Sequence, residues 1–379
     1  MSKSVKKVLI LLSVLSLSLL LSACGDNGAD DGYINLGLLL PVSGPQATFG
    51  FDMERAIILA AEEINAAGGV LGGRMFNVLP VADDGCDPMM AAMAGASIAA
   101  SDAHFVLGGY CSGATIAALQ ELHDNDLIMV IGASNSTAIT ALGLNTAFML
   151  NSPGTHQIDK FVEIIQHLGV TDVAVVHQGD DFTQNLSQIA DRVLPEHGIN
   201  IVTTQVMEIG VPDASAIVTA IRHAGAELTF WAGYYADGGN FLGQLRAGGF
   251  DGYIVTADGA TSVELIVAAG PAGEGVLALS PPAAQFSPGG EAFIAAYEAR
   301  WNTSPGAFDP LAYTSLFLLA QAIETAGSIE YDAVRNALQN IDFTGLTGRV
   351  IFTPDRELRY SNFIVLEIRN GQFVHRADI

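Results

Sequence analysis

The chain has 379 residues, half of them hydrophobic, and carries a formal net charge of −24 at pH 7 with histidine neutral. This composition is typical of a globular protein and excludes a disordered chain, while the negative charge excludes a nucleic-acid-binding protein, which needs a basic surface. The length exceeds one ordinary hydrophobic core, so two domains are expected.

The first 32 residues predict export and a lipid anchor. Three lysines precede an apolar run over residues 8–21, as in a secretory signal peptide. The run is shorter than the roughly 20 residues that span a membrane comfortably. The sequence Leu-Ser-Ala-Cys that ends at Cys24 resembles the lipobox of bacterial lipoproteins. The resemblance implies that residues 1–23 are a signal peptide, that Cys24 is lipidated and that residues 24–32 form a flexible tether; an ordinary signal peptide with an incidental cysteine is the alternative.

Strand and helix patterns alternate along the chain from residue 34 onward. The predicted strands are 34–40, 76–81, 105–107, 127–131, 147–150, 173–176, 199–206, 228–232, 253–257 and 276–279, with helices at 53–66, 89–100, 112–122, 156–168, 182–194, 214–224, 241–247 and 263–268. Helices at 291–300, 311–326 and 331–338 follow, and then short strands at 349–352, 363–368 and 373–375. This alternation predicts an α/β fold with two doubly wound, Rossmann-like lobes, in which helices cover both faces of parallel sheets. The late helices imply that the chain crosses between the lobes more than once.

The stretch from Phe105 to Leu122 predicts a strand that turns through glycines into a helix. Gly108 and Gly109 let the backbone turn sharply, and Ser112 stands where an N-cap is favoured. The free N–H groups of a helix start suit a carboxylate or another small anion. The alternative is a purely structural turn, because such units are common in α/β proteins.

Two cysteines remain if Cys24 carries the lipid. Cys86 and Cys111 both follow predicted strands, and an exported protein meets an oxidising compartment. A disulfide that closes this loop would stabilise the fold by roughly 3 kcal/mol. Two buried thiols or a metal site are the alternatives, although no cluster of histidines or cysteines supports a metal.

Four motifs in order carry a resemblance to a known family. They are Pro41-Val-Ser-Gly-Pro45, Ile64-Asn-Ala-Ala-Gly-Gly-Val70, Asp83-Asp-Gly-Cys-Asp-Pro88 and Gly109-Tyr-Cys-Ser112. In combination they resemble the periplasmic leucine/isoleucine/valine-type binding proteins of ABC transporters, from residue 34 almost to the end. The resemblance implies a type I periplasmic binding protein, with the ligand between two lobes that a three-segment hinge joins. It implies no enzyme activity, no cofactor and no metal.

The family pattern also implies the limits of the lobes. The first lobe is expected to comprise residues 33–152 and 282–355, and the second lobe 153–281 and 356–379. The crossings are expected near Ser152-Pro153, at Ser280-Pro281-Pro282 and within 354–360.

The resemblance further implies the residues of a ligand site. These are Phe49, Tyr110, Ser112, Ala133, Ser134, Asn135, Phe182, Tyr234, Asp258, Gly259 and Phe308. Ser112 matches a serine that binds the ligand α-carboxylate, Asp258 matches an acid that takes the ammonium, and Cys86 and Cys111 match a disulfide. The sequence departs from the branched-chain binders at Phe49 and Phe182, where they have tyrosine. It also has aspartate at 258, where glutamate is usual, and Asn135, where threonine is frequent.

Without the family, most of these residues have ordinary interpretations. The phenylalanines would be core residues, Asp258 with Gly259 would be a turn, and Asn135 would cap the next helix. The shared position of the set just beyond predicted strand ends favours a binding site instead.

The expected function is that of a lipid-anchored solute receptor in the periplasm or cell envelope. It would be a monomer that delivers a small amino acid-like ligand to an ABC permease in the inner membrane, with no nucleic-acid partner. An amide or urea receptor, or a ligand sensor, of the same fold is the alternative. A serine hydrolase that uses Ser112 is disfavoured, because the Gly-x-Ser-x-Gly motif is absent.

Overall fold

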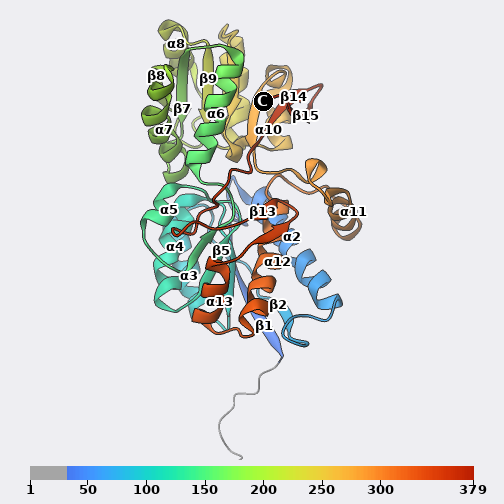
Figure 1. Cartoon of the computed structure of the whole chain (residues 1–379). Coiled ribbons are helices and arrows are strands. Elements are labelled where there is room, and N and C mark those ends of the chain that lie inside the picture. The colour runs from blue at the N-terminus through green and yellow to red at the C-terminus, as the bar shows by residue number, and fades with distance from the viewer. Residues whose placement is uncertain (1–31) are drawn as a thin grey trace, which may run out of the picture. The chain divides into compact units, whose positions relative to one another are not determined.

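Two β-sheets, each assembled from strand–helix units, organise residues 32–379, the part of the chain that this computed structural model describes (Figure 1). The predictions of a signal peptide and of lipidated Cys24 lie outside the described residues. Among the described helices, none has the length and apolar character needed to cross a membrane.

The first sheet has the strand order β2-β1-β4-β5-β6, and the short β3 also pairs with β1. Its strands are β1 (Tyr33–Leu40), β2 (Met75–Val78), β3 (Ala82–Asp83), β4 (Phe105–Gly108), β5 (Ile128–Ile131) and β6 (Ala147–Met149). Its helices are α2 (Ala47–Ala66), α3 (Pro88–Ala99), α4 (Ser112–Asp124) and α5 (Thr137–Ala141). The pairings β1–β4, β4–β5 and β5–β6 are parallel, and β4, β5 and β6 are buried along their whole length. Such burial on both faces explains their continuous apolar sequences.

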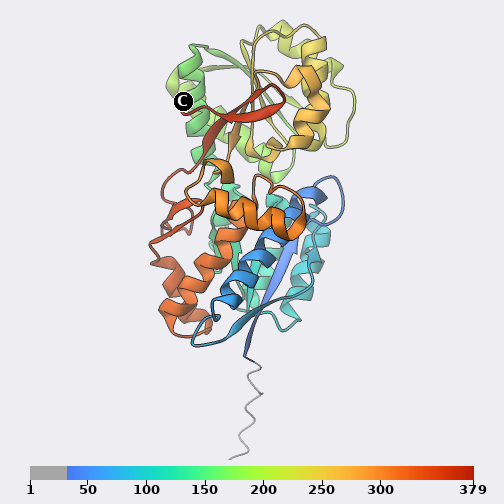
Figure 2. The same cartoon turned by 90° about the vertical axis from the view of Figure 1, so that its right-hand side faces the viewer.

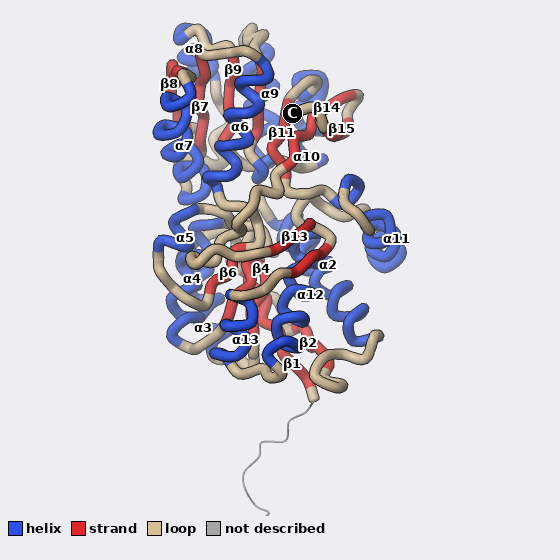
Figure 3. Tube along the Cα trace, in the orientation of Figure 1, coloured by secondary structure: helices blue, strands red, loops and turns tan. Residues whose placement is uncertain are grey.

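The second sheet has the order β15-β14-β11-β10-β9-β7-β8. Its parallel strands are β7 (Asp172–His177), β8 (Asn200–Val206), β9 (Leu228–Ala232), β10 (Tyr253–Thr256) and β11 (Leu277–Ser280). An antiparallel edge follows, formed by β14 (Ile364–Arg369) and β15 (Gln372–His375). The helices are α6 (Gly154–Leu168), α7 (Asp181–Val193), α8 (Ser215–Ala224), α9 (Tyr235–Ala247) and α10 (Val263–Ala269), with 3₁₀ turns η1 (Leu194–His197), η2 (Asp258–Ala260) and η3 (Gly270–Gly273). Figure 3 shows helices on both sides of these strands.

The late helices return to the first sheet, as the sequence predicts. They are α11 (Gly290–Trp301), α12 (Asp309–Ala326) and α13 (Tyr331–Gln339), preceded by η4 (Ala284–Phe286) and followed by the hairpin β12 (Phe343–Gly345) and β13 (Gly348–Val350). Helix α12 packs on α2, β4 and β5, and both views show it beside α2 (Figure 2). We call the elements around the first sheet the first lobe and those around the second sheet the second lobe.

The chain passes between the two lobes three times, which confirms the predicted doubly wound fold with a three-segment hinge. It does so after β6, after β11 and between β13 and β14. The three predicted crossing segments lie on these connections. The residue limits proposed for each lobe stay a prediction.

Helices α2 and α9 both begin six residues earlier than the sequence predicts, at Ala47 and Tyr235. The glycines near their starts are the reason for the difference, because glycine ordinarily disfavours helix. Here it permits close packing. A Cβ atom on Gly50 would lie 1.7 Å from the carbonyl oxygen of Pro41, and one on Gly239 would lie 2.4 Å from the Cβ of Ala268.

The predicted disulfide between Cys86 and Cys111 is present. It ties the loop before α3 to the residue that precedes α4, with the two Cα atoms 5.3 Å apart. Asp84 supports the loop, since its Oδ1 accepts a hydrogen bond from the Cys86 N–H at 2.8 Å. The disulfide therefore joins two loops at the carboxyl ends of β3 and β4, the strands on either side of β1.

Removing this bond is expected to destabilise the protein. The double variant Cys86→Ser, Cys111→Ser should lose roughly 3 kcal/mol of unfolding free energy, because the unfolded chain regains the entropy that the closed loop denies it. Urea unfolding measures the change. The reduced wild-type protein is the control and should match the variant; equal stability of the variant and the oxidised protein would contradict the prediction.

Candidate functional site

Nine of the eleven predicted site residues line one cavity between the two lobes. They are Tyr110, Ala133, Ser134, Asn135, Phe182, Tyr234, Asp258, Gly259 and Phe308. Most follow the carboxyl ends of β4, β5, β9 and β10, which is where open α/β sheets place their ligands. Phe182 lies at the start of α7 and Phe308 immediately precedes α12.

Two glycines after β4 position the first-lobe part of this wall. Gly108 has φ +122° and Gly109 has φ +74°, a region that favours glycine. A Cβ on Gly108 would lie 2.3 Å from the carbonyl oxygen of Leu39. The carbonyl oxygen of Gly109 accepts hydrogen bonds from the N–H groups of Ala133 and Ser134, at 3.2 and 2.9 Å. These hydrogen bonds join the loop after β4 to the loop after β5, and both loops contribute residues to the cavity wall.

Among the described residues that line the cavity, Asp258 has the only carboxyl group, and it is buried. Its Oδ2 accepts hydrogen bonds from Asn135 Nδ2 at 2.9 Å and from Asn151 Nδ2 at 3.1 Å, and its Oδ1 accepts one from the Gly259 N–H at 3.0 Å. Burial raises the pKa of Asp258 to about 6, against the opposing effect of hydrogen bonds with Gln157, Asn151 and the Gly259 N–H. Because Asn135 belongs to the first lobe, the Asp258 carboxylate joins the two lobes.

Aromatic rings enclose the rest of the cavity. The ring centroids of Tyr110 and Phe308 are 5.3 Å apart, and those of Phe182 and Tyr234 are 5.4 Å apart. Phe49 lies outside the cavity wall, but its ring packs on Tyr110 and Phe308 at 4.9 and 5.2 Å. Burial raises the pKa of the Tyr110 and Tyr234 hydroxyls well above the ordinary value. These rings therefore remain neutral and provide an apolar surface.

Ser112 does not line the cavity, and the prediction that it caps the following helix is wrong. Cys111, held by the disulfide, precedes α4, and Ser112 is its first helical residue. The Ser112 Oγ accepts a hydrogen bond from the Ser136 N–H at 3.3 Å instead. The proposal that Asn135 caps the next helix is also wrong, because Ser136 caps the unpredicted helix α5.

Three polar residues near the cavity were missed by the sequence analysis. Asn151 and Gln157 both lie beside Asp258; Asn151 donates to its carboxylate, and the Gln157 Oε1 accepts from its N–H at 3.4 Å. Asp180 accepts a hydrogen bond from the Tyr234 hydroxyl at 2.6 Å. Asn151 follows β6 and Asp180 follows β7. Both could therefore be predicted from the rule that ligands bind beyond the carboxyl ends of parallel strands.

The cavity is small. The space open to the centre of a water-sized sphere is about 10 Å³, which is room for about one water molecule. Its polar groups are one carboxylate and several neutral donors and acceptors, an arrangement that suits a ligand with a cationic group. In the described residues no histidine is hydrogen-bonded to Ser112, so the nucleophile–base pair of a serine hydrolase is not formed there.

The model of the family "Periplasmic binding protein" matches residues 33–372. The chain belongs to this family. Among curated relatives, this periplasmic binding protein is 29% identical over 338 residues to a leucine-, isoleucine-, valine-, threonine- and alanine-binding protein of Pseudomonas aeruginosa, which covers 88% of this chain and 89% of the relative.

Solved structures show the same fold. A leucine-binding protein of Thermotoga maritima superposes with a TM-score of 0.83 at 24% identity, over 91% of this chain and 98% of that one. A solute-binding protein of an ABC transporter from R. palustris, solved in complex with benzoate, superposes with a TM-score of 0.82 at 17% identity, over 91% and 95%. This periplasmic binding protein therefore shares its two-lobed architecture with proteins that bind chemically different ligands.

Proposed function

We propose that this periplasmic binding protein is a lipid-anchored receptor that captures a small amino acid-like ligand between its lobes and delivers it to an ABC importer. The observation that carries the proposal is the buried Asp258 carboxylate in the cavity, surrounded by neutral polar groups and aromatic rings. A buried carboxylate is costly alone and favourable once it is paired with a cation. The Pseudomonas relative, which is named for binding amino acids, supports the same ligand class.

Each end of the ligand has a partner in this proposal. The ammonium group binds Asp258, and the aromatic rings contact the ligand side chain. The α-carboxylate binds neutral donors of the first lobe that line the cavity, the Ser134 hydroxyl and the Asn135 amide.

Binding requires the lobes to separate, because the cavity holds about one water molecule. Further hydrogen bonds, besides those of Asn135 and Asn151, hold the lobes together at their facing edges. Asn185 of α7 donates to the Thr137 Oγ1 at 2.9 Å and accepts from the Thr137 N–H at 3.2 Å, and the Tyr235 hydroxyl donates to the Pro45 carbonyl at 2.8 Å. A ligand that contacts both lobes shifts the open–closed equilibrium towards the closed form.

The second candidate is a receptor for an amide, urea or an aromatic acid. The R. palustris protein was solved with benzoate, so proteins of this fold also bind an aromatic acid. Asp258 favours the amino acid instead, because a ligand with a carboxylate and no cation would place a second negative charge in the same cavity. A sensor that signals occupancy, in place of delivery, would use the same site.

Mass spectrometry of protein gently purified from its native cells tests the proposal. Under native conditions we expect one non-covalent ligand with the mass of an amino acid, which is released on denaturation. The denatured chain should begin at Cys24 and carry the mass of a lipid, while a Cys24→Ala variant should carry none. A ligand without an amine would support the second candidate, and an unmodified Cys24 would overturn the lipid anchor.

A further inference from the structure

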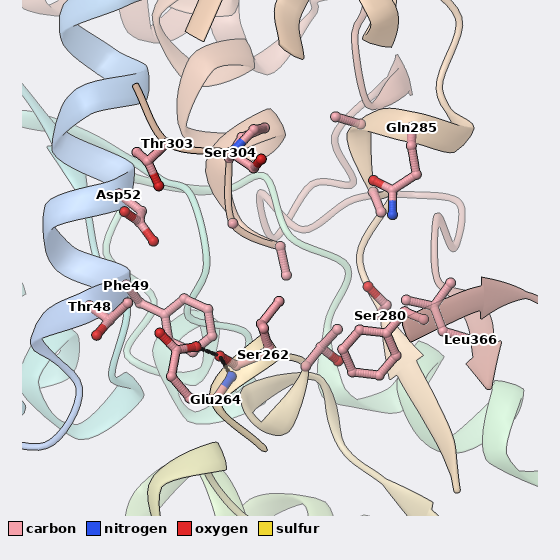
Figure 4. A pocket seen from close by; sticks show the side chains of 18 of the residues that line it. Thr48, Phe49, Asp52, Ser262, Glu264, Ser280, Gln285, Thr303, Ser304 and Leu366 are labelled. Atoms are coloured by element: carbon pink, nitrogen blue, oxygen red, sulfur yellow. Dashed lines mark hydrogen bonds between the residues drawn. The ribbon is translucent and has the colours of Figure 1, made fainter. Parts of the chain in front are cut away.

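A second, larger cavity lies beyond the ring of Phe49. The space in it that is open to the centre of a water-sized sphere is about 560 Å³, within the range of small-molecule sites. Phe49 lines it and also packs on Tyr110 and Phe308 of the ligand site, so one aromatic ring separates the two spaces. We call this space the side cavity. Figure 4 shows it between α2, which carries Asp52, and the segment that carries Ser262 and Glu264.

Both lobes contribute a carboxylate to the side cavity. Asp52 comes from α2 of the first lobe and Glu264 from α10 of the second lobe, and their side chains face the same open space in Figure 4. The Oδ1 of Asp52 is paired with Arg55 Nη1 at 2.9 Å, and the Oε2 of Glu264 accepts a hydrogen bond from Ser262. Within the described residues, Asp52 Oδ2 and Glu264 Oε1 accept no hydrogen bond. One oxygen of each carboxylate is thus available to a ligand.

The charge of the side cavity favours a cation. Arg55 is the one basic residue in its wall and is already bound to Asp52, so the wall carries a net negative charge. A third carboxyl group, Asp309, is buried behind the wall, with its Oδ1 3.7 Å from the position of a Cβ on the wall residue Gly306. An anion would meet these carboxyl groups, whereas a cation is attracted by all of them.

The remaining lining is suited to an organic cation. The rings of Phe49 and Phe373 line the side cavity, and aromatic faces attract ammonium groups. The hydroxyl groups of Thr48 and Thr303 add hydrogen-bond acceptors. A bare metal ion fits less well, since no group of three or more histidine, cysteine, aspartate or glutamate ligands is present in residues 32–379.

We propose that the side cavity binds a small organic ammonium ion between Asp52 and Glu264, at a site distinct from that of Asp258. Because the two carboxylates belong to different lobes, the bound cation holds the lobes together and favours the closed form. Burial raises the pKa of Asp52 to about 6, so its carboxylate is ionised in mildly alkaline solution. The proposal is independent of the function proposed above, since it does not require the cavity at Asp258 to be occupied.

The test uses n-butylammonium as the probe, with 1-butanol and butyrate as neutral and anionic molecules of similar size. Ligand-observed NMR titration, at about pH 8 where Asp52 is ionised, measures each dissociation constant. We expect saturable one-to-one binding of n-butylammonium that is stronger than that of 1-butanol, and no binding of butyrate.

Two variants locate the probe. Asp52→Asn and Glu264→Gln should each weaken n-butylammonium binding by about tenfold, since each removes a charge-assisted hydrogen bond. Glu62→Gln is the matched control, because Glu62 lies on the same helix as Asp52 but is exposed and bound to Arg300. If Asp52→Asn fails to fold, the binding of n-butylammonium by Glu264→Gln alone tests the proposal. Equal binding of 1-butanol, no saturable binding, or wild-type binding of n-butylammonium by Glu264→Gln would overturn the proposal.

Discussion

Replacing Asp258 with alanine is expected to weaken the binding of a zwitterionic amino acid by about 2–4 kcal/mol, the range for truncating one partner of a buried charge pair. This corresponds to a roughly 30- to 1,000-fold higher dissociation constant. The ammonium group would lose its only anionic partner in the cavity wall. Asn135 and Asn151 would also lose the acceptor of their Nδ2 hydrogen bonds. Calorimetry with the ligand identified by mass spectrometry measures the change.

Two further variants make this test specific. Asp258→Asn keeps the size of the side chain and removes the charge, so it should also bind weakly if the ligand carries an ammonium group. Asp251→Ala is the matched control, since Asp251 is exposed and precedes the same strand, β10, at its opposite end. Unchanged affinity in both Asp258 variants would refute the assignment of the ammonium partner.

Replacing Asp309 with asparagine is expected to make the free protein more stable above pH 7 by up to about 4 kcal/mol. Burial raises the pKa of Asp309 to about 7, and the neighbouring charge of Asp52 adds to the increase. The folded state therefore holds this proton more tightly than the unfolded chain does between about pH 4 and pH 7. The free energy of unfolding falls as the pH rises through this window. Above it, the folded state bears the full cost of the buried Asp309 charge.

Thermal or urea unfolding at a series of pH values measures this effect. The stability of the wild type should decline from about pH 4 to pH 7, because the pKa values of Asp52, Asp84 and Asp258 are also raised to about 6 by burial. Asp309→Asn should show a shallower decline, and its amide can still accept the hydrogen bond that the Gly306 N–H donates to Asp309 Oδ2. The exposed control Asp332→Asn should follow the wild type. Identical slopes for Asp309→Asn and the wild type would contradict the prediction.

Much of the fold follows from local patterns in the sequence. The buried strands β4, β5 and β9 are short, mostly apolar runs, and their shortness together with their β-branched and aromatic residues indicates a strand. The predicted starts of the helices are less accurate than the predicted strands. Gly50 and Gly239 disfavour helix locally, and only their tertiary neighbours, the Pro41 carbonyl and Ala268, explain why glycine is required inside α2 and α9.

The candidate site also has one part that the sequence predicts and another that it does not. Tyr110, Tyr234 and Asp258 each follow a strand of a parallel sheet, and such strands all end at the same edge, so their proximity could be predicted from the sequence. The hydrogen-bond partners of Asp258 could not be predicted in this way. Asn135 and Asn151 lie more than a hundred residues away from it in the chain, and no local pattern reports a contact across that separation.

The sequence by itself determined the alternating α/β order and the likeness to periplasmic binding proteins, because these depend on neighbouring residues and on motifs, and it predicted the disulfide between Cys86 and Cys111 from the number of cysteines and from the family resemblance. The tertiary structure alone decided that Ser112 is the first residue of α4 and lies away from the cavity wall. It also decided that Asp52 and Glu264 share a second cavity. The physical reason is that these features depend on contacts between segments that lie far apart in the chain, and such contacts leave no periodic signal in the sequence.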